Sequence, residues 1–168
     1  MGIFGRKKKN ESDNPYLGLR QQVLDLKPET IMHETDEEHP VYAALVDIGA
    51  KGGTVSLACV IDGTASLYYS NGGGMIGLGH ADDDIREAAL TLLQCPKEVL
   101  KAFTIADTFP LPAREKHIIH FITKEGVYRQ ELDMKKYKNY PRELQAVICY
   151  YQNVITKMRE FDERSGKT

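Results

Sequence analysis

The chain has 168 residues, of which 42% are hydrophobic and 27% charged, a balance typical of a soluble globular domain. A chain of this length corresponds to about one domain and can bury a hydrophobic core without disulfides or metals. No apolar run approaches the roughly 18 residues that a membrane-spanning helix needs. Composition therefore excludes an integral membrane protein of the helical kind, as well as a disordered or fibrous chain.

The net charge of −2 is unevenly distributed. Four basic residues lie within the first nine positions: Arg6, Lys7, Lys8 and Lys9. The rest of the chain is therefore acidic, which argues against a nucleic-acid-binding surface on the folded part. We expect residues 1–13 to be a flexible basic arm. Ile3 and Phe4 beside these cations leave open a weak contact of residues 3–9 with an anionic membrane, because each basic residue there contributes about 1 kcal/mol.

Cysteine usage and the start of the chain both predict a cytoplasmic location. The three cysteines, Cys59, Cys95 and Cys149, are far apart and odd in number, unlike a disulfide framework. Cys59 and Cys149 fall within apolar periodic segments, where we expect reduced thiols in the core. Polar residues 10–13 follow the basic start, where a secretory signal would have an apolar stretch, so no such signal is expected.

The first part of the chain predicts a helix and then three strands. Asn14 and Pro15 form a good helix start, and apolar residues recur at helical spacing as far as Leu26. An acidic loop over residues 29–40 follows. Asp62-Gly63 is the residue pair that a two-residue hairpin favours. The three strands that we expect around this turn cover residues 42–48, 54–61 and 64–69.

The second part predicts a helix, two strands and a final helix. Asp84 and Glu87 have capping-box spacing for a helix over residues 82–94. A short helical piece follows over residues 96–103, and an extended stretch over residues 108–112. Two strands are then expected, over residues 116–123 and 127–132. Behind Pro141, one apolar stripe continues without interruption: Leu144, Val147, Ile148, Tyr151, Val154, Ile155 and Met158.

These elements predict a single α+β domain over residues 14–162, in the order α-βββ-α-ββ-α. Its core would be a five-stranded, mainly antiparallel sheet with helices packed on it. We expect residues 163–168 to form a frayed tail.

Five glycines lie within eight positions of the segment 70–80, between a predicted strand and a predicted helix. Gly72, Gly74 and Gly77 match the dinucleotide-binding pattern G-x-G-x-x-G. The preceding strand, however, is the return arm of a hairpin, whereas the fingerprint belongs to a parallel βαβ unit. Three successive aspartates, 82–84, would also repel a pyrophosphate at the helix start. We therefore favour a tight strand-to-helix junction, in which glycines permit positive φ and close helix packing.

The alternative for this segment is a small-ligand or enzyme site. His80 with Asp82 would be its acid-base pair, although helix capping explains Asp82 equally well. The candidate ligand-binding residues are Asn71, Gly72, Gly73, Gly74, Gly77, His80 and Asp82.

No metal, cofactor or catalytic residue is predicted elsewhere. The acidic loop carries His33 and His39 six positions apart, whereas a zinc-binding helix needs its histidines four apart. His117 and His120 are three apart on a predicted strand and therefore lie on opposite faces. No cysteine stands in a recognisably activated setting, and no nucleophile-elbow motif occurs.

Two tyrosine pairs are candidates for a protein interface. One member of each pair, at 68–69 and 150–151, must point away from the main apolar face of its element. Solvent-facing tyrosines are enriched at interfaces. The interface candidates are Tyr68, Tyr150 and Tyr151.

The element order over residues 14–162 resembles that of class I type III secretion chaperones and related small α+β proteins. Those proteins are homodimers that bind extended segments of partner proteins. The resemblance implies that the helix 82–94 and the strand 116–123 are dimer candidates. The glycine-rich segment is a departure from that family.

Together these observations favour a cytoplasmic, non-enzymatic protein-binding module of adaptor, chaperone-like or immunity type, and a homodimer. Two alternatives stay open. One is a small-ligand binder or enzyme that uses the segment 70–80, and the other is a peripheral membrane protein held by residues 3–9.

Overall fold

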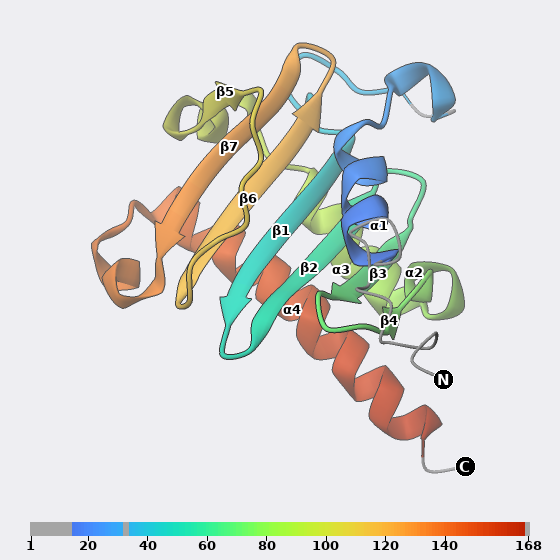
Figure 1. Cartoon of the computed structure of the whole chain (residues 1–168). Helices are drawn as coiled ribbons and strands as arrows, with labels where there is room; N and C mark the ends of the chain where they lie inside the picture. The colour runs from blue at the N-terminus through green and yellow to red at the C-terminus, as the bar shows by residue number, and fades with distance from the viewer. Residues whose placement is uncertain (1–14, 32–33, 167–168) are drawn as a thin grey trace, which may run out of the picture.

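A single antiparallel sheet organises residues 15–31 and 34–166, the part of the chain that the computed structural model describes (Figure 1). Seven strands form it, in the order β4 (Gly74–Met75), β3 (Ala65–Tyr69), β2 (Gly53–Val60), β1 (Ala43–Ala50), β6 (Lys116–Thr123), β7 (Gly126–Asp133) and β5 (Thr104–Ala106). The helices are α1 (Pro15–Leu24), α2 (Leu78–Ala81), α3 (Asp83–Leu93) and α4 (Arg142–Ser165). Three short 3-10 turns complete the set: η3 (Pro28–Thr30), η4 (Lys97–Ala102) and η5 (Met134–Asn139).

The expected α+β class and antiparallel sheet are confirmed, but the expected count of five strands is wrong. The two missed strands, β4 and β5, have two and three residues. Such short strands lack the alternating pattern by which a strand is recognised in sequence. They exist because a hairpin and a crossing loop bring them beside β3 and β7.

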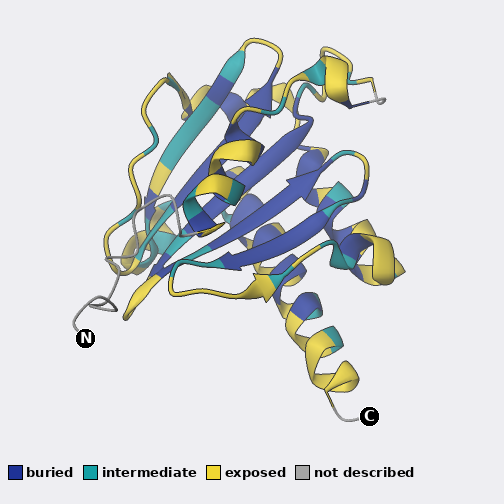
Figure 2. Ribbon diagram, turned by 45° about the vertical axis from the view of Figure 1, so that its right-hand side comes forward, coloured by how far each residue is buried: buried dark blue, intermediate teal, exposed yellow. Residues whose placement is uncertain are grey.

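The two faces of the sheet have different covers. α3 and α4 pack on one face, while α1 and the connection over residues 107–115 cross the other (Figures 1 and 2). The central strand β1 is apolar on both sides because it contributes to both cores. Ala44 and Val46 belong to the core under α3 and α4, and Ala43 and Leu45 to the core under α1. In Figure 2 the strands beneath α1 are buried and its outer side is exposed.

α4 confirms the predicted stripe, since all seven of its apolar residues are buried. The helix continues to Ser165, into the stretch for which we expected a frayed tail. The cap of α3 differs from the prediction. Its N-cap is Asp82, whose carboxylate accepts a hydrogen bond from the Ile85 amide at 3.0 Å, so the Asp84 capping box does not form the helix start.

Cys149 corrects another expectation. It lies on the solvent side of α4 and is exposed, whereas Cys59 and Cys95 are buried. An apolar stripe of period 3.6 leaves intervening positions on the outer face, and Cys149 follows Ile148 at such a position. Asn14, the expected cap of α1, lies outside the described residues. Within those residues, no helix is both long and apolar enough to cross a bilayer.

Candidate functional site

The glycine segment forms a turn and a short edge strand. Gly72 and Gly73 have φ of 110° and 81°, and the Tyr69 amide donates to the Gly73 carbonyl at 3.2 Å. Asn71 is exposed in this turn. Gly74 then pairs with Tyr68 as part of β4. Positive φ at two successive positions requires glycine, because a β-carbon would be strained there.

The end of the segment is a close junction between a helix and a hairpin. Gly77 caps α2 with a φ of 71°. A β-carbon at Gly79 would lie 1.9 Å from the Gly63 carbonyl oxygen, so only glycine lets α2 lie this close to the turn between β2 and β3. Backbone geometry therefore accounts for these glycines, and ligand binding by the segment stays a prediction.

His80 and Asp82 are engaged with different partners. His80 Nε2 lies 3.0 Å from the Thr64 hydroxyl on the neighbouring hairpin. Asp82 caps α3 and lies 3.6 Å from the Arg164 guanidinium on α4. His80 therefore binds the turn between β2 and β3, and Asp82 contacts both α3 and α4.

The other histidines and the tyrosines are placed as follows. His117 and His120 lie on opposite faces of β6, as predicted, with His117 Nδ1 2.6 Å from the Tyr151 hydroxyl under α4. Tyr151 and Tyr68 are buried within this chain, so of the three interface candidates only Tyr150, 43% exposed, faces solvent. His33 lies outside the described residues, among which no group of three or more possible metal ligands occurs.

Beneath α1, the structure brings together a polar network that sequence reasoning missed. The Arg20 guanidinium donates to the Asp47 carboxylate on β1, with Nη2 2.8 Å from Oδ2, and to the Phe109 carbonyl at 2.8 Å. Ser56 on β2 donates to Asp47 Oδ1 at 2.5 Å, and its Oγ lies 2.6 Å from the Tyr16 hydroxyl. All the side chains in this network are at least nine-tenths buried.

His120 adjoins the network from β6. Its Nδ1 lies 3.0 Å from the Leu45 carbonyl oxygen and 3.9 Å from Asp47 Oδ2. Because a carbonyl oxygen only accepts hydrogen bonds, Nδ1 must carry a proton and donate it to Leu45. Burial lowers the pKa of His120, so the ring is neutral near pH 7. The trio of serine, histidine and aspartate is not arranged as a catalytic triad, because Ser56 donates to Asp47 and not to the histidine. The hydrogen bonds of the whole network instead hold α1, β1, β2 and the connection 107–115 together.

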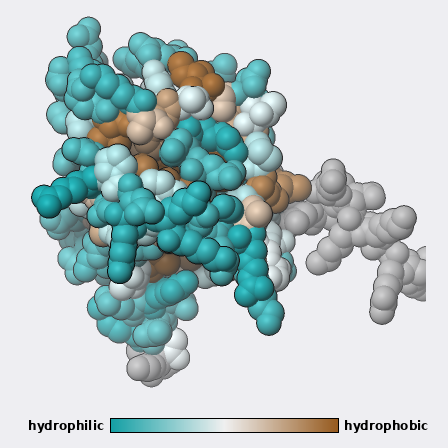
Figure 3. All heavy atoms as spheres, turned by 90° about the vertical axis from the view of Figure 1, so that its left-hand side faces the viewer, coloured by the Kyte–Doolittle hydropathy of each residue, from teal (hydrophilic) through white to brown (hydrophobic). Residues whose placement is uncertain are grey.

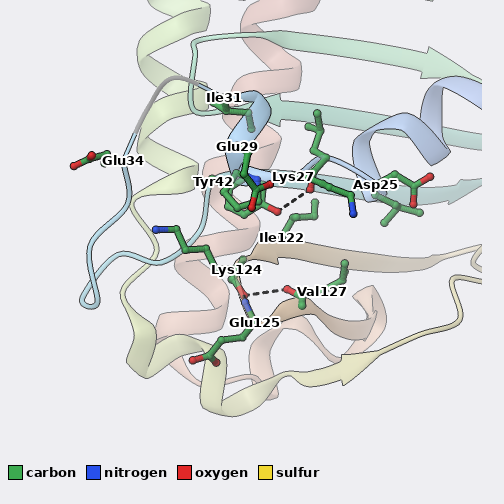
Figure 4. A pocket seen from close by; sticks show the side chains of 15 residues that line it. Asp25, Lys27, Glu29, Ile31, Glu34, Tyr42, Ile122, Lys124, Glu125 and Val127 are labelled. Carbon is green, nitrogen blue, oxygen red and sulfur yellow. Dashed lines mark hydrogen bonds between the residues drawn. The ribbon is translucent and has the colours of Figure 1, made fainter.

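A wide groove of about 1300 Å³ opens at one end of the sheet. The end of α1 and the turn η3 form one wall, and the hairpin turn between β6 and β7 forms the other (Figure 4). Six apolar side chains make its floor, and all but Leu26 are more than nine-tenths buried: Leu24, Leu26, Ile31, Tyr42, Ile122 and Val127. Charged side chains line the remainder, four acidic and two basic: Asp25, Glu29, Glu34, Glu125, Lys27 and Lys124.

Two hydroxyl groups in the groove fasten its walls. Tyr42 donates to the Leu26 carbonyl at 2.7 Å, and Thr123 donates to the Gly126 carbonyl at 3.0 Å (Figure 4). Burial raises the pKa of the Tyr42 phenol, and the nearby Glu29 carboxylate adds to this effect. The phenol is therefore protonated at neutral pH and acts as a donor. The walls are held by the fold itself, so the groove is preformed.

In the described part of the chain, the large apolar side chains that are well exposed lie outside the groove, on separate elements. They are Ile76, Ile105, Leu111 and Tyr150. Figure 3, which faces the β7 and β5 edge, shows a mainly hydrophilic surface with small apolar areas. The groove combines a concave shape with apolar lining side chains.

Neither a family model, nor a curated protein, nor a solved structure matches this chain.

Sequence patterns held a signal for the buried network but none for the groove. Arg20 occupies a position between Tyr16 and Val23 at helical spacing, and Asp47 interrupts an otherwise apolar strand. Two opposite charges within core-facing patterns indicate a buried ion pair. The groove combines residues 24–29, Ile31, Glu34, Tyr42 and 122–127, which no local pattern connects.

Proposed function

We propose that this protein is a binding module whose groove holds an extended segment of a partner protein. The main support for this proposal is the groove itself, which is preformed and has an apolar floor and charged edges. An apolar side chain of the partner would contact Ile122 and Val127, which line the floor. Concave sites that combine an apolar surface with a few polar groups are the usual places of recognition.

The charge of the groove defines the partner's chemistry. Acidic side chains outnumber basic ones among its lining residues by four to two. Neighbouring Asp36 and Glu37 in the adjoining loop add further negative charge, whereas Glu38 is paired with Lys97 at 3.3 Å. A segment with an apolar anchor and flanking lysine or arginine residues complements this surface, because opposite potentials steer association and fix orientation.

The chemistry of the lining residues favours binding over catalysis. Among the lining side chains that the structure describes, there is no histidine, cysteine or serine. Its tyrosine and threonine hydroxyls donate to backbone carbonyls of their own walls. What the groove offers to a bound segment is apolar contact and charge.

An adaptor, chaperone-like or immunity-type role in the cytoplasm, exercised by a homodimer, extends this proposal. β6 is paired on both edges, with β1 and with β7, so a second copy would have to use another surface than a strand edge at residues 116–123. The exposed residues of α3 are mainly polar, including Asp83, Arg86 and Glu87.

Selection from a random peptide library on the immobilised full chain tests this function. The selected peptides should share an apolar residue flanked by basic ones. The groove variant carries Glu29→Lys, Glu34→Lys and Glu125→Lys, and its matched control carries Glu87→Lys, Glu160→Lys and Glu163→Lys, all exposed residues. Titration of a selected peptide should show at least about tenfold weaker binding to the groove variant and unchanged binding to the control. Equal affinity for all three proteins would refute the groove as the binding site.

A further inference from the structure

We infer that the groove has an occupant within the same chain: the basic arm before Pro15, whose Ile3 and Phe4 would contact the apolar floor. This inference rests on the proposed function of the groove. It adds that the protein regulates its own binding surface, because a partner segment must displace the arm.

Sequence chemistry is the first support. Ile3 and Phe4 form an apolar pair, and four consecutive cations begin two positions after Phe4. This is the composition that the groove selects: an apolar anchor with positive charge beside it. The groove offers the exposed parts of its apolar floor, which is mostly buried, and an excess of carboxylates. In contrast, the network under α1 is already neutralised, since Arg20 pairs with Asp47.

The reach of the chain is the second support. Pro15 begins α1, and Leu24 at the other end of that helix lines the groove. A helix of ten residues is about 15 Å long. Phe4 precedes Pro15 by eleven residues, which span up to roughly 36 Å when extended. The arm can therefore return along α1 and place Phe4 in the groove with length to spare.

A tether of this length also favours binding of the arm to the groove over binding of a free peptide. Linking a ligand to its site by a short segment gives an effective concentration in the range of about 1 mM. A segment with an intrinsic dissociation constant of about 0.1 mM would thus occupy the groove most of the time. Raising the salt concentration should release it, since charge attraction at a solvated surface is screened within about 10 Å at 0.1 M salt.

The test uses the full chain, the arm variant Ile3→Ser with Phe4→Ser, and a control variant, Ile76→Ser, at a side chain that is 67% exposed beside β4. The probe is a fluorescent peptide with the sequence of residues 2–12. It should bind the arm variant about tenfold more tightly than the wild type or the control, because only that variant has lost the competing arm. Amide NMR signals of Lys124 and Gly126 should differ between the wild type and the arm variant, and the signal of Gly63 should not.

Several outcomes would overturn the inference. Equal affinity of the probe for wild type and arm variant, or unchanged signals at Lys124 and Gly126, would show that the arm lies elsewhere. If the library peptides still bind in a manner that depends on Glu29 and Glu125, the groove function stands and only the arm's role fails. A wild type that sediments as a dimer beside a monomeric arm variant would place the arm on a second copy. Vesicle binding that requires Phe4, with no change in the groove, would assign the arm to a membrane.

Discussion

Arg20 and Asp47 form an ion pair in the interior of this protein, with 2.8 Å between Nη2 and Oδ2 and with side chains that are 6% and 0% exposed. Three parts of the chain meet at it. Arg20 belongs to α1, Asp47 to the central strand, and the Phe109 carbonyl, which also accepts from Arg20, to the connection between β5 and β6. The pair therefore fixes both covers of one sheet face.

Replacing Arg20 should destabilise the fold strongly. We expect Arg20→Met to lower the free energy of unfolding by about 3–5 kcal/mol, because it leaves the Asp47 carboxylate buried without its cation. Urea unfolding followed by circular dichroism measures this change. The double variant with Asp47→Leu is the control and should recover part of the loss, since no lone charge remains buried. A loss below about 1 kcal/mol in the single variant would contradict the assignment.

Glycine substitutions should separate close packing from ordinary helix propensity. Gly79→Ala should destabilise by about 2 kcal/mol, because its β-carbon would meet the Gly63 carbonyl oxygen at 1.9 Å. Gly18→Ala is the matched control on α1, where a β-carbon meets nothing within 4 Å. It should stabilise by roughly 0.5–1 kcal/mol through helix propensity. Thermal melts of both variants check the opposite signs, and a neutral Gly79→Ala would argue against the tight junction.

Stability should fall on mild acidification. Burial lowers the pKa values of His117 and His120 in the folded protein below the ordinary value of about 6.5. As the pH falls through about 6.5, these two histidines bind protons in the unfolded chain but stay neutral in the folded protein. The free energy of unfolding therefore decreases. Above about pH 7.5 both states are neutral at these rings and the effect vanishes.

Urea midpoints between pH 8 and pH 5 measure this dependence. The double variant His117→Gln with His120→Gln should give a flatter profile across that range, whatever its absolute stability. Asp133, whose pKa is lowered by Lys116, contributes only at more acidic pH. A wild-type midpoint that stays constant from pH 7 to pH 5 would show that these rings are not buried neutral.

The three thiols should differ in reactivity. Cys149 is exposed, whereas burial raises the pKa values of Cys59 and Cys95 to about 12. Because the thiolate is the reactive species, a thiol reagent at pH 8 should modify one cysteine in the folded protein and three in urea. Cys149→Ser should abolish the reaction of the folded protein. Labelling of Cys59 under native conditions would indicate opening of the sheet, and labelling of Cys95 would indicate opening of the core beside α3.

Local patterns were sufficient for the elements that one face of the core defines. The seven buried residues of α4 follow the 3.6-residue period, and β6 spans the predicted residues 116–123. β1 is mainly apolar on both faces, and it lies at the centre of the strand order. Such patterns show how a segment packs against one apolar layer. The predicted ends of most elements lie within one or two residues of the observed ends.

What the sequence determined by itself is thus the α+β class, the long strands, the final helix and the opposite faces of His117 and His120. Only the tertiary structure decided the rest. β4 and β5 are too short to carry a period and form because neighbouring strands supply partners. Arg20 reaches an aspartate 27 positions away, and the groove joins segments about a hundred residues apart. Periodicity depends on neighbours along the chain, whereas a buried ion pair and a concave surface depend on which distant segments the packed sheet brings together.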